Sequence, residues 1–72
     1  MEYKIDPIEM GKRLRESRGI RTQVMTAKEL GITQSALHMY EKGERIPRDP
    51  VKVKLANYYN RSIEDLFYIR VA

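Results

Sequence analysis

Apolar residues recur at spacings of three and four along most of this chain, in short runs bounded by glycine, proline or polar capping residues. This spacing gathers apolar side chains on one face of an α-helix, whereas strict alternation would indicate a β-strand. The pattern therefore predicts five short helices joined by brief connections. They are expected at residues 7 to about 18, 23–30, 34 to about 42, about 49–59 and about 62–67.

Residues that favour helix ends stand at the borders of these runs. Asp6 followed by Pro7 is a strong helix start, because aspartate accepts backbone N–H bonds at the N-cap and proline fits the first helical position. Thr22 and Thr33 are expected to cap the second and third helices in the same way. Gly31 is expected to adopt the left-handed conformation that ends the second helix.

The apolar faces of these helices predict one shared core. The positions expected to lie on the inward faces are Ile8, Gly11, Leu14, Ala27, Leu30, Ile32, Leu37, Tyr40, Val51, Val53, Leu55, Ala56, Tyr59, Ile63, Leu66 and Phe67. Met10 is expected beside this face and Glu41 at its edge. The chain is thus predicted to form a single all-α domain over residues 1–72, with its core at about residues 6–68.

The two ends of the chain leave alternatives open. Residues 1–5 carry no helical signal and fit either a loose arm or a short strand, because Tyr3 and Ile5 alternate with charged residues. Residues 68–72 also alternate, and they fit a strand, an extra helical turn or an unstructured end. Both patterns are too short to decide.

Composition narrows the class of function. With no cysteine and one histidine among 72 residues, the chain has no disulfide framework, no thiolate metal site and no paired acid–base constellation. We therefore expect no enzyme activity, no metal, no cofactor and no small-molecule ligand. The sequence also has no apolar run of membrane-spanning length and no signal-peptide hydrophobic region, so a cytoplasmic location is expected.

The distribution of charge indicates what kind of partner the chain binds. Basic residues exceed acidic ones by fourteen to ten, which gives a net charge of +4. Cations gather on both sides of residues 22–43, namely Lys12, Arg13, Arg15, Arg18 and Arg21 before and Lys42, Arg45, Arg48, Lys52 and Lys54 after. A segment flanked by cations suits a DNA groove, whose walls are lined by phosphates.

The segment between these cations has the spacing of a helix-turn-helix. In that motif two helices meet at a steep angle around a tight turn, and the second lies in the DNA major groove. Ala27 is small where the second helix must cross the first, and Gly31 tolerates the positive φ of the turn. Ile32, Leu37 and Tyr40 then supply the apolar contacts that hold the second helix. All five requirements are met in one register.

This run resembles the phage-repressor and Cro-type helix-turn-helix family, also called xenobiotic-response-element-type regulators. The residues that carry the resemblance are Thr22-Gln23, Ala27, Leu30-Gly31-Ile32-Thr33-Gln34-Ser35, Tyr40-Glu41-Lys42-Gly43, Ile46-Pro47 and Leu55-Ala56. The resemblance covers about residues 10–67 and implies a five-helix, lambda-repressor-like domain that binds palindromic operators as a dimer. The sequence departs from the family at Thr26, where a larger apolar residue is usual, and in the short connection between Arg18 and Gln23.

The third predicted helix carries the candidate base-reading residues. Gln34 and Ser35 stand in its first turn, which reaches base edges in this motif, and a glutamine amide can bond adenine N6 and N7 together. Met39 follows one turn after Ser35 and either contacts a thymine methyl group or packs at the rim. His38 follows Gln34 and either meets a base edge or phosphate or remains an exposed bystander.

A second set of residues is expected to hold phosphates. It comprises Thr22, Gln23, Thr33, Lys42, Arg45 and Arg48. Thr22 and Gln23 stand at the N-terminus of the second helix, where backbone amides suit an anion. In similar proteins the glutamine matching Gln23 clamps the DNA backbone and supports the first base-reading residue. The resemblance also pairs Arg18 with Glu41 in a structural ion pair.

The sequence thus predicts a transcriptional regulator, by default a repressor, of bacterial, phage or mobile-element origin, which binds a palindromic operator in double-stranded DNA as a homodimer. The alternative is a protein-interaction or antitoxin-like module on the same scaffold, in which DNA binding is secondary. The aromatic residues Tyr58, Tyr59, Phe67 and Tyr68 fit a single-strand stacking surface less well than core packing or a dimer contact.

Overall fold

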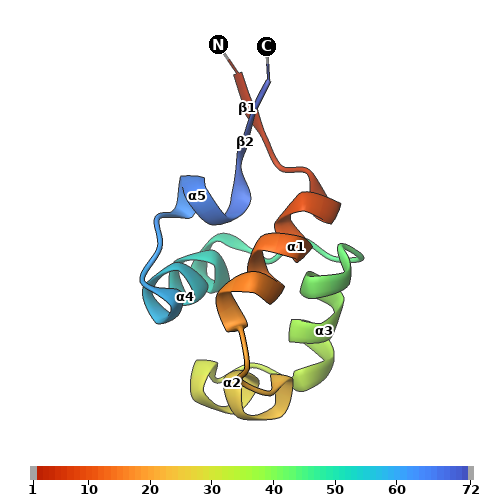
Figure 1. Ribbon diagram of the computed structural model, residues 1–72, viewed down its shortest axis with the longest axis vertical. Coiled ribbons are helices and arrows are strands. Elements are labelled where there is room, and N and C mark those ends of the chain that lie inside the picture. Colours follow the sequence, from red (N-terminus) through yellow and green to blue (C-terminus); the bar gives the residue numbers. More distant parts are fainter. Residues whose placement is uncertain (1, 72) are drawn as a thin grey trace.

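The computed structural model describes residues 2–71, and within this range it contains five helices and a two-stranded sheet (Figure 1). In chain order the elements are β1 (Glu2–Lys4), α1 (Pro7–Arg18), α2 (Gln23–Leu30), α3 (Gln34–Lys42), α4 (Asp49–Tyr59), α5 (Ile63–Phe67) and β2 (Ile69–Val71). The five helices confirm the predicted five-helix fold, and their bounds follow the residues that favour helix ends.

Side-chain caps explain where four of the five helices begin, whereas α4 begins after Arg48 without such a cap. The Asp6 carboxylate accepts hydrogen bonds from the backbone N–H groups of Ile8 (3.0 Å) and Glu9 (3.1 Å). The hydroxyls of Thr22, Thr33 and Ser62 each accept one from the backbone N–H three residues later, at 3.0–3.1 Å. Each such cap stabilises its helix by roughly 1 kcal/mol. For helices of eight or nine residues this local term matters, because such helices are marginal in isolation.

The chain termini form the one element that sequence periodicity left open. β1 and β2 pair antiparallel with Glu2 opposite Val71, Tyr3 opposite Arg70 and Lys4 opposite Ile69. The pairing places the two ends of the chain side by side at one end of the bundle (Figure 1). The fold is therefore mostly helical rather than purely all-α.

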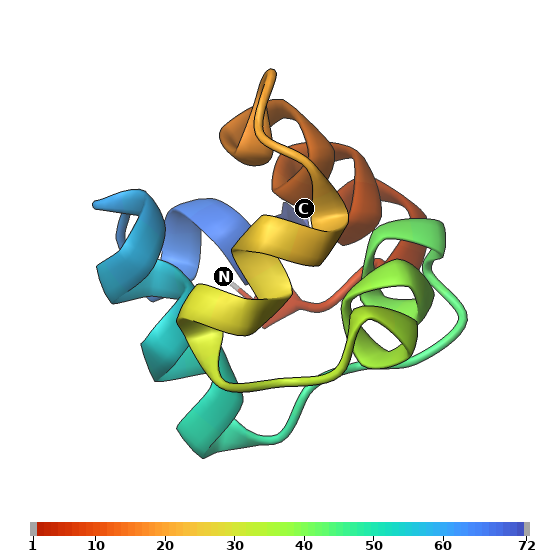
Figure 2. The same cartoon turned by 90° about the horizontal axis from the view of Figure 1, so that it is seen from below.

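The helices enclose one core, and α1 lies between α3 and α5 and packs against both (Figure 1); Figure 2 shows the same bundle from below. The buried apolar side chains come from every helix and are Met10, Leu14, Ala27, Leu30, Leu37, Tyr40, Leu55, Ala56, Tyr59, Leu66 and Phe67. Ile32 packs against this core from the turn between α2 and α3. No helix within residues 2–71 is both long and apolar enough to cross a membrane.

Two helix faces are rotated from the prediction. On α1, Met10 is buried and Ile8 is 69% exposed, because the inward face runs through residues 10, 11 and 14. On α4, Lys52 is buried and Val53 is 45% exposed. The aliphatic stem of Lys52 covers the core while its ammonium reaches Asp49 Oδ1 at 3.4 Å and lies 5.5 Å from the Tyr68 ring centre. A lysine therefore occupies a core position that the apolar pattern had assigned to valine.

Thr26, the departure from the family pattern, is fully buried on α2, and its hydroxyl has no hydrogen-bond partner in the structure. Replacing Thr26 with valine keeps the shape and removes the unpaired hydroxyl. We expect Thr26→Val to raise the free energy of unfolding by about 1 kcal/mol, measured by urea unfolding. Thr26→Ser, which keeps the hydroxyl and loses a methyl group, should instead lower it. A Thr26→Val protein no more stable than the original would show that this hydroxyl is satisfied.

Candidate nucleic-acid interface

α2 and α3 meet around a turn fixed by backbone hydrogen bonds. Gly31 has φ 73° and donates to the carbonyl of Lys28 (3.2 Å), and the N–H of Ile32 donates to the carbonyl of Ala27 (3.0 Å). This arrangement ends α2 and redirects the chain into α3 across it (Figure 2). α3 is held from behind by Leu37, which is fully buried, and by Tyr40. The opposite side of α3 is thereby left at the surface.

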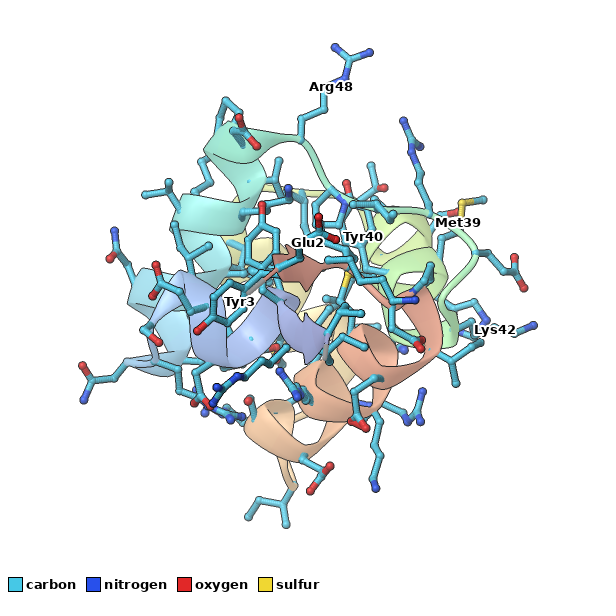
Figure 3. All side chains as sticks on the ribbon, turned by 90° about the horizontal axis from the view of Figure 1, so that it is seen from above. Glu2, Tyr3, Met39, Tyr40, Lys42 and Arg48 are labelled. Carbon is cyan, nitrogen blue, oxygen red and sulfur yellow. The ribbon has the colours of Figure 1, made fainter. Side chains whose placement is uncertain are left out.

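The exposed side of α3 brings together three of the predicted base-reading residues. Gln34, Ser35 and His38 are exposed, and with Gln23 from α2 they line an open hollow of about 370 Å³. Met39 is only partly exposed and lies at the outer edge of the helix (Figure 3). The hollow is lined entirely by side chains that can donate or accept hydrogen bonds, which suits the edge of a base pair.

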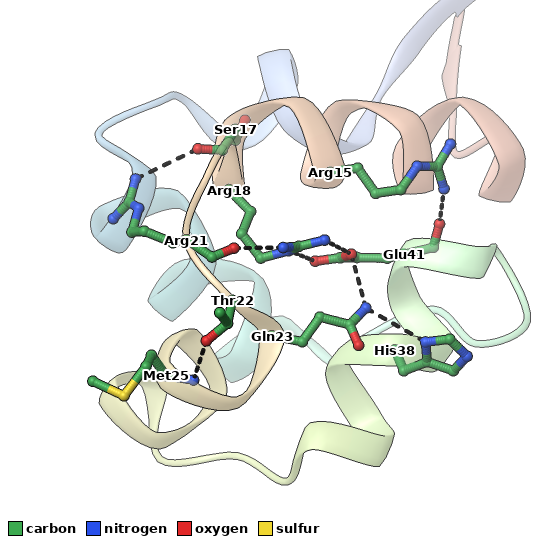
Figure 4. Close-up of polar contacts among 9 residues, drawn as sticks. All are labelled: Arg15, Ser17, Arg18, Arg21, Thr22, Gln23, Met25, His38 and Glu41. Atoms are coloured by element: carbon green, nitrogen blue, oxygen red, sulfur yellow. Dashed lines mark hydrogen bonds and ion pairs between the residues drawn. The ribbon is translucent and has the colours of Figure 1, made fainter.

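Behind this surface lies a buried ion pair. Arg18 donates from Nε to Glu41 Oε2 (2.7 Å) and from Nη2 to Glu41 Oε1 (2.9 Å), so the pair is bidentate (Figure 4). The Glu41 side chain is only 2% exposed, so its predicted position at the edge of the helix face is wrong. Leu37, Tyr40 and Glu41 occupy successive inward positions of α3. The carboxylate raises the pKa of Arg18, chiefly through their hydrogen bond.

Arginines of α1 also donate to two backbone carbonyls beside this ion pair. Arg15 donates to the carbonyl oxygen of Glu41, and Arg18 also donates to the carbonyl oxygen of Arg21 (2.5 Å), at the start of the connection to α2 (Figure 4). Nearby in α4, burial raises the pKa of Tyr59 to about 12, and the charge of Glu41 adds to this effect. The ion pair thus joins α1 to α3, and the bond to the Arg21 carbonyl also holds the connection to α2.

Gln23 connects the buried ion pair to the surface. Its Nε2 donates to Glu41 Oε1 at 3.0 Å and lies 3.4 Å from Nδ1 of His38 (Figure 4). This contact is the feature of the site that sequence reasoning missed. It joins the first turn of α2 to the middle of α3, so no local spacing could indicate it.

The residues expected to hold phosphates surround this surface. The hydroxyls of Thr22 and Thr33 accept helix-capping bonds from Met25 (3.1 Å) and Ala36 (3.0 Å). Lys42 pairs with Glu44 at 2.9 Å, which lowers the pKa of that carboxyl, chiefly through the hydrogen bond. Its charge is therefore partly compensated.

Two arginines lie in the loop that follows α3. Arg45 and Arg48 are exposed and line a second hollow of about 530 Å³ together with Tyr40, Ile46 and Val51. Arg48 projects away from the bundle (Figure 3). Two exposed guanidinium groups at the border of the α3 surface are suited to bidentate contacts with phosphate.

Other proteins share this helical arrangement. Residues 12–66 match the family model HTH_3, described as helix-turn-helix. Among solved structures, the restriction-modification controller protein C.AhdI of Aeromonas hydrophila has 30% sequence identity and a TM-score of 0.76, with 86% of this chain and 93% of that chain covered. The SOS-response transcriptional repressor LexA of Eubacterium rectale has 28% identity and the same TM-score. That match covers 82% of this chain and 65% of the LexA chain. No curated protein sequence matches.

Proposed function

The chain belongs to the HTH_3 helix-turn-helix family, of Cro/C1 type, which makes it a DNA-binding transcriptional regulator, and from that premise we propose that it binds a two-fold symmetric operator as a homodimer. The whole of residues 1–72 would act as one DNA-binding unit. Repression by occlusion of RNA polymerase is the proposed outcome. One observation carries this proposal above the others: α3 is fastened by Leu37 and Tyr40 so that the side carrying Gln34, Ser35 and His38 faces outward.

In this proposal the exposed turn of α3 reads bases. Gln34 would bond adenine N6 and N7, and Ser35 would bond a neighbouring base edge. Met39 offers apolar contact to a thymine methyl group, and His38 lines the same hollow as Gln34. Lys42, four residues after His38, is exposed on the same side of α3.

Phosphates would be held around the reading surface. The backbone amides at the N-terminus of α2, at Thr22 and Gln23, point a positive helix end at the DNA. Thr33 stands at the corresponding end of α3. Arg45 and Arg48 would follow one DNA strand beyond α3, with Lys42 beside them. Contacts of this kind fix the register of a protein on DNA without reading sequence.

The dimer follows from size and symmetry. A single module of this size buries too little surface on DNA for high affinity, so weak binding by a monomer and tight binding by a dimer are expected. Two α3 helices related by a two-fold axis would read half-sites about 34 Å apart, one turn of the double helix. The similar structures named above are those of a controller protein and a transcriptional repressor, which supports the regulatory part of the proposal.

A second function is favoured by one observation. Ile20, Val24 and Met25 lie in or beside the start of α2 and are 103%, 56% and 54% exposed. Exposed apolar side chains close together along the chain suit a protein partner. A protein-interaction module would bind that partner with little dependence on salt. DNA binding should weaken steeply as salt rises, because each phosphate contact releases counterions.

The salt dependence of DNA binding tests the proposal. Fluorescence anisotropy with a labelled duplex should show affinity that falls linearly on a log–log plot against salt concentration. The Arg45→Ala/Arg48→Ala double variant should bind more weakly on every sequence and show a shallower slope. Tight binding with no salt dependence, or no binding to duplex DNA at low salt, would contradict the proposed function.

Gln34 gives the sharpest single substitution in the reading surface. Gln34→Ala is expected to cost about 1–3 kcal/mol of binding free energy on the preferred site and to relax the preference at one base position. Gln34 is exposed, so the stability of the fold should change little. Anisotropy titrations on the preferred site and on its single-base variants measure both effects. Equal losses on every sequence would assign Gln34 to the DNA backbone instead.

A further inference from the structure

We propose that Gln23 is a positioning residue that selects the His38 tautomer with its proton on Nε2, so that His38 donates to a guanine in the DNA major groove. The inference rests on the proposed function, since it concerns the same surface. It assigns His38 to base reading rather than to a bystander position. It also directs the NH₂ group of Gln23 to Glu41 and His38 rather than to a phosphate.

The buried carboxylate determines how the Gln23 amide is turned. Glu41 is paired with Arg18, 2% exposed and able only to accept hydrogen bonds. The Gln23 amide lies 3.0 Å from Glu41 Oε1, so its NH₂ group must face the carboxylate. The reversed amide would set two oxygen acceptors against each other, one of them charged and buried. The orientation of Gln23 is therefore dictated by the ion pair.

The same NH₂ group determines the protonation of His38. An amide NH₂ carries two hydrogens, and Nε2 of Gln23 lies 3.4 Å from His38 Nδ1 as well as 3.0 Å from Glu41. An NH₂ group can only donate, so Nδ1 must accept through its lone pair. In a neutral imidazole the proton then resides on Nε2. A chain of contacts thus runs from Arg18 through Glu41 and Gln23 to the histidine ring (Figure 4).

These contacts determine which atoms of Gln23 and His38 face outward. With its NH₂ committed, Gln23 presents its carbonyl oxygen, an acceptor that phosphate oxygens repel. His38 presents an N–H donor beside Gln34 and Ser35 in the same hollow. In the major groove guanine offers two adjacent acceptors, N7 and O6, whereas adenine sets an amino donor beside N7. A single outward N–H can also bond adenine N7 or thymine O4, but it favours guanine, where N7 and the neighbouring O6 both accept.

The protonation state is tested in the free protein. A long-range ¹H–¹⁵N spectrum of the full chain at about pH 8, where an ordinary histidine is neutral, reports which nitrogen of the single histidine is protonated. We expect only the Nε2–H form in the original protein. Gln23→Met, which keeps the bulk and loses the amide, should show a mixture of both forms. A Nδ1–H form in the original protein, or identical spectra for the two proteins, would overturn the inference.

The base preference is tested on DNA that the original protein selects from a random pool. His38→Ala and Gln23→Met should each lose about fivefold in affinity at one and the same guanine, as expected for a single hydrogen bond. Replacing that guanine with 7-deazaguanine should reproduce part of the loss in the original protein and none in His38→Ala. Gln34→Ala is the matched control, because it should lose preference at a different position. Urea unfolding of all three variants checks that stability is comparable.

The experiments distinguish a failure of the proposed DNA-binding function from a failure of the inference about Gln23 and His38. If no DNA sequence is selected, the proposed function fails while the spectrum still reports the state of His38. If a site is selected but no guanine preference depends on His38 and Gln23 together, only the present inference fails.

Discussion

Replacing Arg18 with alanine is expected to lower the free energy of unfolding by about 3–5 kcal/mol, because the change leaves the carboxylate of Glu41 buried without its counter-charge. Glu41 is 2% exposed at its side chain and receives two hydrogen bonds from Arg18. Total stabilities of small domains are about 5–15 kcal/mol, so the variant would be partly unfolded at moderate temperature. Urea or thermal unfolding followed by circular dichroism measures the change.

A matched pair of variants separates burial from charge. Lys42→Ala breaks the exposed ion pair with Glu44 and should change stability little, because that pair lies in water. Arg18→Met combined with Glu41→Leu removes both charges and should recover much of the lost stability, since apolar side chains can replace a buried pair. If Arg18→Ala cost no more than Lys42→Ala, the ion pair would not hold α1 against α3 in the way described.

Gly11→Ala is the second large effect, and here local propensity and packing predict opposite signs. In a helix interior alanine is favoured over glycine by about 0.5–1 kcal/mol, so propensity alone predicts a more stable protein. At Gly11 α1 crosses α3, and an added Cβ would lie 2.9 Å from the carbonyl carbon of Glu41 and 3.2 Å from the carbonyl oxygen of Tyr40. These are backbone atoms that cannot turn aside. We expect a loss of about 1–3 kcal/mol.

The same substitution should disturb the reading surface. α1 and α3 must separate to admit the Cβ, and α3 carries the exposed residues proposed to read DNA. Reduced DNA affinity is therefore expected together with reduced stability in urea. Lys12→Ala, at the neighbouring exposed position of α1, is the control and should affect stability by no more than about 0.5 kcal/mol. A Gly11→Ala protein more stable than the original would show that the two helices do not approach this closely.

Helix borders could be predicted from the sequence because they depend on neighbours along the chain. The caps at Asp6, Thr22 and Thr33 act on N–H groups two or three residues away, and Gly31 needs only its own backbone freedom. The turn between α2 and α3 follows from the same local chemistry. This is why the helix-turn-helix was the most secure part of the prediction.

Core positions were predicted less well where a side chain is amphipathic. Lys52 was missed because its charge marks it as exposed, although its stem is apolar enough to cover the core. Glu41 was placed at an edge because a buried carboxylate is costly unless it is paired. Its partner Arg18 comes from another helix, so the resemblance to a family indicated the pair and the apolar pattern could not.

Contacts between segments far apart in the chain could not be predicted from the sequence. The pairing of β1 with β2 joins the two ends of the chain, and three residues of alternation on each side are compatible with several structures. The contact between Gln23 and His38 likewise depends on how α2 lies across α3. The identity of the candidate residues was therefore available from the sequence, whereas the hydrogen bonds that orient them were not.

Selection of bound duplexes from a random DNA pool by this 72-residue protein tests the central claim most directly. The claim is that the outward side of α3 reads bases in the major groove. We predict enrichment of a two-fold symmetric sequence with half-site centres about 10 base pairs apart, and loss of preference at one position of each half-site in Gln34→Ala. A pool that stays random at low salt, or an enriched sequence identical for both proteins, would contradict the account.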